Sequence, residues 1–289
     1  MSVSVVIPTL NSSVVNRTLD ALFEQTSFDR IAEIFVVGLD APGLVTERAP
    51  VKFISTGNPA FSPVSRNIGI RHARGDLLVF LDADCVPTPT WLERLLACQA
   101  RGRPVVAGSV SLRTEDYRSL CYNLALFSDT LVTSPAGMRP SVSSLNLLVA
   151  REVVDEVGLF NEDLPRSHDV EWSCRIRQAG YEIYFSPDAE LIHLPRPETW
   201  GTVFDKFYRS GYYSSRVRWG YRDVFGTPWF FARPLVFALL SPFISVSAAL
   251  RTFTRNRGMW RYLHTAPALF ACKIAWCLGA YHQIGSSKA

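Results

Sequence analysis

The sequence predicts an α/β fold: a Rossmann-like, mostly parallel sheet covered by helices, followed by a helical region that associates with a membrane. Three observations support this prediction. Short apolar runs alternate with amphipathic stretches from the N-terminus onward, as in βαβ units. One of these runs, residues 77–81, is uninterrupted and leads into two aspartates. The last third of the chain combines basic charge with apolar and aromatic side chains.

The N-terminal part of the chain supplies the alternating elements. Val3–Ile7 is an apolar run that ends at Pro8, and a polar cluster at 11–13 is predicted to cap an amphipathic stretch that reaches Gln25. Further strands are predicted at 34–37, 51–54, 77–81 and 105–110, with helices at 64–73 and after Pro89. This order predicts parallel strands with helices on the faces of the sheet.

The alternation becomes less regular after about residue 111. The predicted elements there are strands at 145–149, 184–185 and 191–193 and helices beginning near Arg151 and covering 168–177. We therefore expect one domain over residues 1–195, with halves at about 1–110 and 111–195, and a second region over 196–289. The start of the chain has no basic segment or cleavage site typical of a secretory signal.

Asp82 and Asp84 follow directly from the predicted strand at 77–81. In open α/β sheets, ligands bind at the carboxyl ends of the strands. Carboxylates at such an edge suit Mg²⁺ or Mn²⁺, which commonly reach a protein through one or two carboxylates plus substrate phosphates. A simple turn is the alternative on these residues alone, because aspartate also favours turns.

Four local patterns occur in a characteristic order over roughly residues 1–195. They are VSVVIPTLN, SRNIGIRHARGDLLVFLDADC, SLNLLVAREVVDEVGLFNEDLPRSHDVEWSCRIRQAGYEI and LIHLP. In this combination the chain resembles the inverting family-2 glycosyltransferases, which have a GT-A fold and a DxD motif. The resemblance implies a nucleotide-sugar donor (a UDP-, GDP- or TDP-sugar) and a divalent metal cofactor, Mn²⁺ or Mg²⁺.

The resemblance also implies roles for individual residues. Asp84 would chiefly hold the metal, Asp82 would contact the metal or the ribose, and His193 would be a further metal ligand. The residues implied to contact the donor are Pro8, Thr9, Asp40, Arg66, Asn67 and Asp82. Asp169 matches the catalytic base. Two places depart from the family pattern: His168 replaces the more usual glutamate, and the loop GLDAPG around Asp40 replaces a DDGS-like form.

The chemistry of an inverting transfer independently requires a catalytic base. Inversion by direct displacement needs one carboxylate that takes the proton of the acceptor hydroxyl, and Asp169 is separate from the aspartate pair. Glu171 is the rival base, and Asp169 alternatively stabilises only the N-terminus of its helix. Likewise, His193 is either a ligand or an ordinary hydrogen-bonded histidine, and Arg66 either contacts the donor or forms a structural ion pair.

The charge distribution separates the two regions of the chain. Residues 1–195 hold 17 basic and 23 acidic residues, whereas residues 196–289 hold 13 basic and 3 acidic ones. Basic charge combined with apolar bulk favours an anionic membrane surface over a nucleic acid as partner. Aromatic residues interleave with arginines over 200–222, which favours an interfacial anchor over a solvated helical face.

Two apolar segments follow in the second region. Pro234–Leu250 is free of charge but has Pro242 at its centre, where we expect a break, and residues 262–284 contain Lys273. Basic stretches flank the first segment on both sides, so a full span would place one of them outside, against the positive-inside tendency. We therefore expect a peripheral, monotopic protein, with C-terminal transmembrane helices as the alternative.

Together these observations predict a metal-dependent, inverting glycosyltransferase at the cytoplasmic face of the cell membrane. It would transfer a sugar from a nucleotide-sugar donor to a lipid-linked or other membrane-borne glycan acceptor in envelope glycan or glycolipid synthesis. The alternatives are a GT-A-like nucleotidyltransferase, which needs no base at Asp169, and a non-catalytic nucleotide-sugar-binding module.

Overall fold

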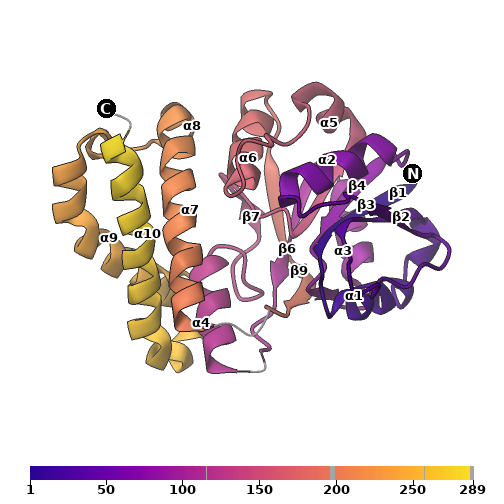
Figure 1. Ribbon diagram of the computed structural model, residues 1–289, viewed down its shortest axis with the longest axis horizontal. Coiled ribbons are helices and arrows are strands. Elements are labelled where there is room, and N and C mark those ends of the chain that lie inside the picture. The colour runs from indigo at the N-terminus through magenta and orange to yellow at the C-terminus, as the bar shows by residue number, and fades with distance from the viewer. Residues whose placement is uncertain (115, 196–198, 257, 287–289) are drawn as a thin grey trace. The chain divides into compact units, whose positions relative to one another are not determined.

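The computed structural model describes residues 1–114, 116–195, 199–256 and 258–286 (Figure 1). The chain divides into two compact units. The first unit comprises Met1–Ser111 and Ala136–Leu194, and the second comprises Leu112–Pro135 and Pro195–Ala289. The boundary predicted near residue 195 coincides with this division, whereas residues 112–135, expected in the first domain, group with the second unit.

A single mixed sheet forms the centre of the first unit. Its strands are β1 (Val3–Leu10), β2 (Ile31–Leu39), β3 (Val51–Ser55), β4 (Leu77–Leu81), β5 (Cys85–Pro87), β6 (Val105–Val110), β7 (Gly137–Met138), β8 (Asn146–Ala150) and β9 (Ile183–His193). The strand order is β3-β2-β1-β4-β8-β6-β9-β5, and β7 pairs with β9. Every side chain of β4, β6 and β8 is buried, which explains their continuous apolar runs.

Strand direction differs between the two halves of this sheet. β1 is parallel to β2 and β4, and β2 is parallel to β3, so these strands end at a common edge. β8 runs antiparallel to β4 and β6, and β9 runs antiparallel to β5 and β7 but parallel to β6. The expectation of a mostly parallel sheet is therefore correct for the N-terminal half and wrong for the other half. Apolar runs indicate burial but carry no information on direction.

The two strands predicted at 184–185 and 191–193 are one continuous strand, β9. Pro187 and Asp188 interrupt its apolar pattern, and its register against β6 shifts between Ala107 and Ser109. This irregularity lets β9 continue to His193, where it pairs with Cys85 of β5. The strand thereby carries His193 to the turn that follows β4.

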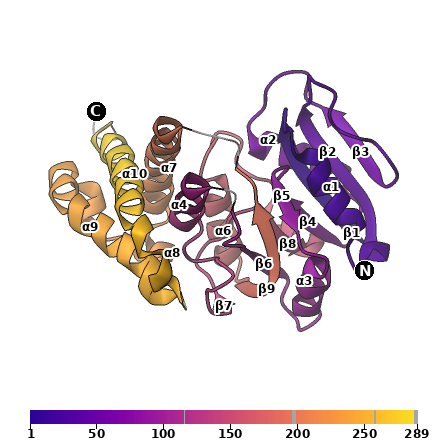
Figure 2. The same ribbon diagram turned by 90° about the horizontal axis from the view of Figure 1, so that it is seen from below.

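Helices cover both faces of the sheet in the first unit. They are α1 (Val15–Phe23), α2 (Ser62–His72), α3 (Trp91–Gln99), α5 (Arg151–Val157) and α6 (His168–Gln178), with a short 3-10 turn η1 (Phe28–Arg30). Figures 1 and 2 show α2, α5 and α6 on one face and α1 and α3 on the other. Phe80 of β4 contacts the rings of Phe160 and Trp172 edge to face, which joins α6 to the sheet.

Helices make up the second unit. They are α4 (Tyr117–Leu126), α7 (Trp200–Gly220), α8 (Arg222–Phe225), η2 (Trp229–Ala232), α9 (Pro234–Arg255), η3 (Met259–Thr265) and α10 (Ala266–Ser286). α10 packs along both α7 and α9 (Figures 1 and 2). The break expected at Pro242 is absent from this described helix, because α9 continues through that residue. A proline removes one backbone donor, which a long packed helix tolerates.

Two helical segments of the described chain are long and apolar enough to cross a membrane by length and composition alone. They are Pro234–Arg255, with a mean hydropathy of 1.7, and Met259–Ser286, with a mean hydropathy of 1.2. Less than half of each is buried inside the protein. Composition therefore permits membrane association. The packing of each helix has to indicate whether the helix spans a membrane or lies on its surface.

Asn146 joins three strands and a helix in the interior of the first unit. Its side-chain amide donates to the carbonyls of Ser109 on β6 and Ala189 on β9, at 3.0 and 3.1 Å. Its oxygen accepts the indole N–H of Trp91 on α3 at 2.8 Å. All three partners lose a hydrogen bond if this side chain is removed.

We therefore predict that Asn146→Ala lowers the free energy of unfolding by about 2–4 kcal/mol, because it leaves buried polar groups unpaired. Urea denaturation followed by tryptophan fluorescence measures the change. Asn58→Ala, at an exposed loop position, is the matched control and should be neutral. Equal stability of the two variants would contradict the interpretation.

Candidate active site

The turn after β4 presents Asp82 and Asp84 at the edge where the parallel strands end. The carbonyl of Ala83, between them, accepts hydrogen bonds from the hydroxyls of Ser12 and Thr18 at 3.0 and 3.1 Å. Ser12 was predicted to cap α1, but α1 has no side-chain cap and this hydroxyl binds the aspartate turn instead. The segment is therefore a turn, and α1 and the residues before it hold that turn in place. Being a turn does not conflict with being a ligand site.

His193 lies beside Asp84. β5 and β9 pair Cys85 with His193, and the backbone N–H of Leu194 donates to the carbonyl of Asp84 at 2.8 Å. The Nε2 atom of the buried histidine is 3.7 Å from Oδ2 of Asp84. The structure thus brings together two of the residues predicted to hold a metal.

Arg66 joins the aspartate turn to α6. This side chain is buried on α2, and its Nη2 forms an ion pair with Oδ1 of Asp82. Its Nη1 lies 3.0 Å from Nε2 of His168, the first residue of α6. Arg66 therefore forms a buried ion pair, and it lies next to the predicted metal and donor residues.

Charge and burial perturb the groups around Arg66. Burial raises the pKa of Asp82, and the carboxylates of Asp84 and Asp169 raise it further, while Arg66 opposes the shift. Burial, together with the positive charge of Arg66, lowers the pKa of His168 to about 4. His168 is therefore neutral at neutral pH, and its Nε2 can accept the hydrogen bond that Arg66 donates.

Within the residues that the structure describes, no group of three or more histidines, cysteines or acidic residues is arranged to hold a metal by itself. One oxygen of Asp82 is engaged by Arg66, which leaves Asp84 and His193 as the closest pair. Their separation of 3.7 Å falls within one coordination shell, whose opposite ligands lie about 4 Å apart. These two residues fit a site that substrate phosphates complete.

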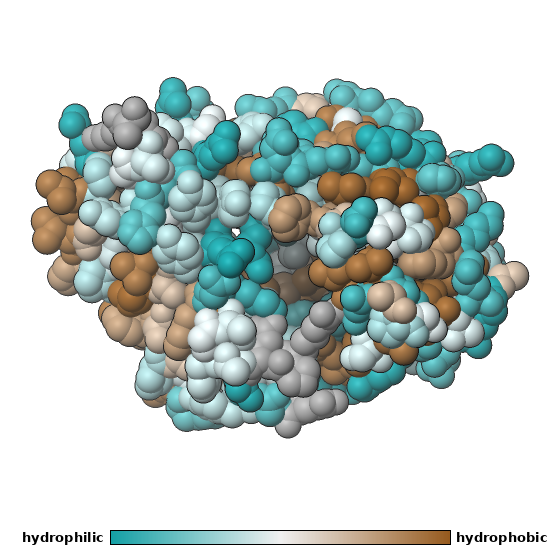
Figure 3. Space-filling model, viewed as in Figure 1, coloured by the Kyte–Doolittle hydropathy of each residue, from teal (hydrophilic) through white to brown (hydrophobic). Residues whose placement is uncertain are grey.

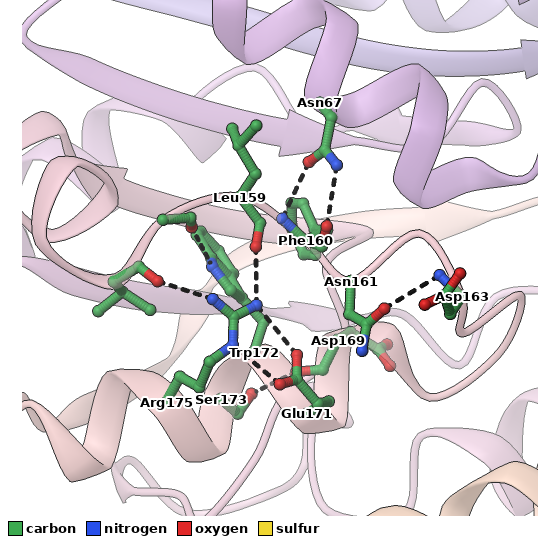
Figure 4. Close-up of polar contacts among 12 residues, drawn as sticks. Asn67, Leu159, Phe160, Asn161, Asp163, Asp169, Glu171, Trp172, Ser173 and Arg175 are labelled. Carbon is green, nitrogen blue, oxygen red and sulfur yellow. Dashed lines mark hydrogen bonds and ion pairs between the residues drawn. The ribbon is translucent and has the colours of Figure 1, made fainter.

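Asn67, the neighbour of Arg66 on α2, contacts a loop. Its amide nitrogen donates to the carbonyl of Phe160 and to the carboxylate of Glu162, at 2.9 and 2.7 Å. Its oxygen accepts the backbone N–H of Phe160 at 2.9 Å (Figure 4). The sequence placed Asn67 beside the diphosphate, but the structure directs the amide to this loop, which precedes α6.

Glu171, the rival base, is occupied by Arg175 one turn further along α6. The guanidinium contacts both carboxylate oxygens, at 2.8 and 3.0 Å, in a bidentate pair. It also donates to the carbonyls of Val157 and Leu159, each at 2.7 Å (Figure 4). Glu171 is buried and holds Arg175 against the loop, so its environment is structural.

Asp169 lies in the first turn of α6 and is half-buried. Its Oδ1 accepts the backbone N–H of Val170 at 2.9 Å, as is typical of an acidic residue at a helix N-terminus. Figure 4 shows this carboxylate apart from the Glu171–Arg175 pair. Its charge acts on Asp82, so it belongs to the same cluster.

The remaining predicted donor residues lie at the ends of β1 and β2. Pro8 and Thr9 pair with Val37 and Gly38. Gly38 has φ of +146°, and a Cβ atom there would come within 1.9 Å of the carbonyl oxygen of Thr9. Only glycine permits the two strands to approach this closely.

Asp40 follows β2 in a loop that its own side chain closes. The carboxylate accepts the backbone N–H of Val45 at 2.7 Å, and the carbonyl accepts that of Gly43 at 3.1 Å. This use of the carboxylate agrees with the departure of the GLDAPG loop from the family pattern. Arg66, Asp82, Asp84, His193 and Asp169 therefore gather in one cluster, whereas Asp40 is engaged in its own loop.

Comparisons with known proteins agree with this architecture. Residues 4–120 match the model of glycosyl transferase family 2. Glycosyltransferase AglE of Haloferax volcanii is 29% identical over 219 residues, which cover 72% of this chain and 71% of that protein. Pre-mycofactocin glycosyltransferase of Mycobacterium tuberculosis is 27% identical over 154 residues, which cover 51% of this chain and 33% of that protein.

A solved structure shows the same fold. The mannosyltransferase PcManGT from Pyrobaculum calidifontis, in complex with GDP-Man and Mn²⁺, superposes with a TM-score of 0.60 at 17% identity and covers 99% of this chain and 88% of its own. The chain therefore shares the fold of this protein, which is of the GT-A type.

Sequence reasoning missed the side chains that hold the site in place. Ser12 and Thr18 bind the carbonyl of Ala83, between the two aspartates, and Arg175 binds Glu171 and the loop before α6. Only Arg175 left a signal, because it follows Glu171 by four residues on a predicted helix.

The neutral state of His168 predicts a pH dependence of stability. Its pKa is about 4 in the folded protein, against 6.5 for an unperturbed histidine. Between these values the unfolded chain binds a proton that the folded protein does not bind, so the free energy of unfolding falls as the pH falls from 6.5 toward 4. His168→Gln keeps an acceptor for Arg66 but does not titrate.

Melting temperatures of the wild type and His168→Gln, measured across this pH range, test the prediction. The variant should lose less stability on acidification, because it lacks the histidine that binds a proton only in the unfolded chain. Parallel curves for the two proteins would show that the histidine does not contribute.

Proposed function

We propose that this protein is a metal-dependent, inverting glycosyltransferase that uses a nucleotide-sugar donor. Its acceptor is lipid-linked or otherwise membrane-borne, in envelope glycan or glycolipid synthesis at the cytoplasmic face of the membrane. The observation that supports the reaction best is the cluster around Arg66. It combines a carboxylate and a histidine 3.7 Å apart with a separate carboxylate, Asp169, on another element.

Asp84 and His193 are the residues that would hold the divalent cation, with Asp82 at its side. Mn²⁺ is bound in PcManGT, which supports a cation of this class here. When bound, the cation supplies positive charge that stabilises the departing nucleoside diphosphate. Two protein ligands suffice, because Mg²⁺ and Mn²⁺ commonly complete their coordination with phosphate oxygens and water.

Arg66 contributes a fixed positive charge at the aspartate turn. Its ion pair with Asp82 orients that carboxylate, and the neutral His168 leaves the guanidinium charge uncompensated on its other side. A glutamate at 168 would neutralise more of this charge. The arrangement therefore favours the binding of an anionic diphosphate close to Asp82 and Asp84.

Asp169 is the carboxylate that we assign as general base. It would accept the proton of the acceptor hydroxyl as that oxygen attacks the sugar from the side opposite the diphosphate. Glu171 is less suited to this role, because Arg175 occupies both of its oxygens. The paired glutamate instead fixes the helix on which Asp169 lies.

Asp169→Asn should reduce sugar transfer by about 10²–10⁴-fold, the usual contribution of a general base, and leave the Kd for the donor unchanged. Transfer is measured with membrane extract as acceptor source, and donor binding by calorimetry with Mn²⁺. Glu171→Gln is the matched variant. It should mainly lower the melting temperature, because it breaks a buried ion pair.

An equal loss of donor binding and of transfer in Asp169→Asn would argue against a base. A larger loss of transfer in Glu171→Gln at unchanged stability would reassign the role to Glu171.

A second experiment tests the cation site. In a thermal-shift screen of UDP-, GDP- and TDP-sugars, a bound donor should raise the melting temperature of the wild type more strongly with Mn²⁺ than with EDTA. Asp84→Asn should remove the difference between Mn²⁺ and EDTA. Asp188→Asn, at an exposed position on β9, should retain it. A full Mn²⁺ effect in Asp84→Asn would place the cation elsewhere.

A further inference from the structure

α9 presents an uncovered apolar face, which we call the α9 face. It consists of five large side chains that lie on one side of the helix and are 47–76% exposed: Leu235, Leu239, Phe243, Val246 and Leu250. Figure 3 shows apolar side chains at the edge of the molecule where Figure 1 places α9. Exposed apolar side chains gathered in one patch mark an interaction site, whereas scattered ones do not.

The opposite side of α9 is also apolar and is already covered. Phe237 is fully buried and packs with Cys277, Ala280 and Ile284 of α10. The helix therefore has two apolar sides. One is buried against α10, and the other is exposed among the described residues. An ordinary surface helix has a polar second side.

α10 is packed too closely within the second unit to be a separate membrane span. A Cβ atom on Gly211 of α7 would come within 1.8 Å of the carbonyl oxygen of Trp276, and one on Gly279 of α10 within 1.8 Å of that of Tyr208. The backbones of α7 and α10 are therefore in contact. Lys273, at the centre of α10, donates to the carbonyl of Ala125 on α4 at 2.7 Å.

α7 in turn carries charges that hydrocarbon would not accept. Asp205 and Arg209 form an exposed ion pair at 2.7 Å, and Lys206, Arg216 and Arg218 lie on the same helix. A charged side chain at the centre of a bilayer is strongly disfavoured. Because α7 and α10 pack backbone to backbone, α10 cannot cross a bilayer unless the charged helix α7 also enters the bilayer. Of the three long helices, α9 alone presents an extended apolar face to a lipid phase.

The surroundings of the α9 face suit an anionic lipid surface. Residues 224–286 contain no aspartate or glutamate. Arg233 lies at the N-terminal end of α9 and Arg251 near its C-terminal end, and both are exposed. Trp229 and Trp260, at the two ends, are 67% and 59% exposed. Exposed tryptophans and arginines beside an apolar face are typical of helices at a membrane interface.

We propose that α9 lies in the plane of an anionic lipid surface with its face inserted at the boundary between headgroups and acyl chains, while α10 stays within the protein. The α9 face, at residues 235–250, extends over about 23 Å at 1.5 Å per residue, within a helix of 22 residues. Because the other side of α9 packs on α10, which is tied to the charged helix α7, the helix would lie parallel to the surface. This inference concerns the second unit and does not depend on the reaction assigned to the first.

Flotation of the full-length protein with vesicles tests the proposal. The wild type should float with vesicles of phosphatidylcholine and phosphatidylglycerol, less with phosphatidylcholine alone, and less at high salt. The double variant Leu239→Asp/Phe243→Asp should lose binding by roughly 100-fold, because two exposed apolar contacts are replaced by charge. Leu278→Asp, at an exposed apolar position of α10 outside the face, is the control and should float like the wild type.

Two further measurements separate the alternatives. Alkaline carbonate should release the wild type from native membranes, and lipids brominated near the headgroup should quench its tryptophan fluorescence more than deeply brominated ones. Resistance to carbonate with a protease-protected C-terminal fragment would overturn the proposal in favour of a span. Equal flotation of wild type and double variant would also overturn it. So would a dimer that the double variant dissociates, without lipid binding, because a second copy would then cover the face.

Discussion

The buried guanidinium of Arg66 is the group around which the candidate site is organised. A buried charge persists only when it is paired and hydrogen-bonded, and Arg66 obtains its partners from two elements far apart in sequence: Asp82 after β4 and His168 at the start of α6. This requirement holds α6 close to the aspartate turn. It also keeps His168 neutral, so that the positive charge remains directed at the edge where Asp82 and Asp84 lie.

A second set of contacts fixes the loop that precedes α6. Asn67 holds the backbone of Phe160, and Arg175 holds the carbonyls of Val157 and Leu159, so both sides of the loop before α6 are fixed by buried hydrogen bonds. Asp169 is thus carried by a helix whose position is determined independently of any substrate. Such a scaffold would place the proposed base precisely relative to the reacting atoms.

In the second unit, the burial of apolar helix surface is the main constraint. α10 packs along both α7 and α9, whereas α9 packs on α10 with one apolar side and leaves the α9 face exposed. Hydropathy alone classes these helices together, since both segments pass the same test of length and composition. Packing separates them, because the close approach of α7 and α10 ties the second apolar segment to a charged helix. An enzyme held by one face of α9 would act on acceptors within the same membrane surface.

The sequence by itself determined the α/β class, the position of most strands and helices in the first unit, and the aspartates and histidine of the cluster. These follow from local pattern: apolar period, capping residues and motifs that resemble a family. Only the tertiary structure decided the antiparallel half of the sheet, the pairing of Glu171 with Arg175, the use of Asn67 and Asp40 in loops, and the different surroundings of α9 and α10. The physical reason is that strand direction and the partner of a buried polar group depend on segments distant in sequence, which a local pattern does not encode.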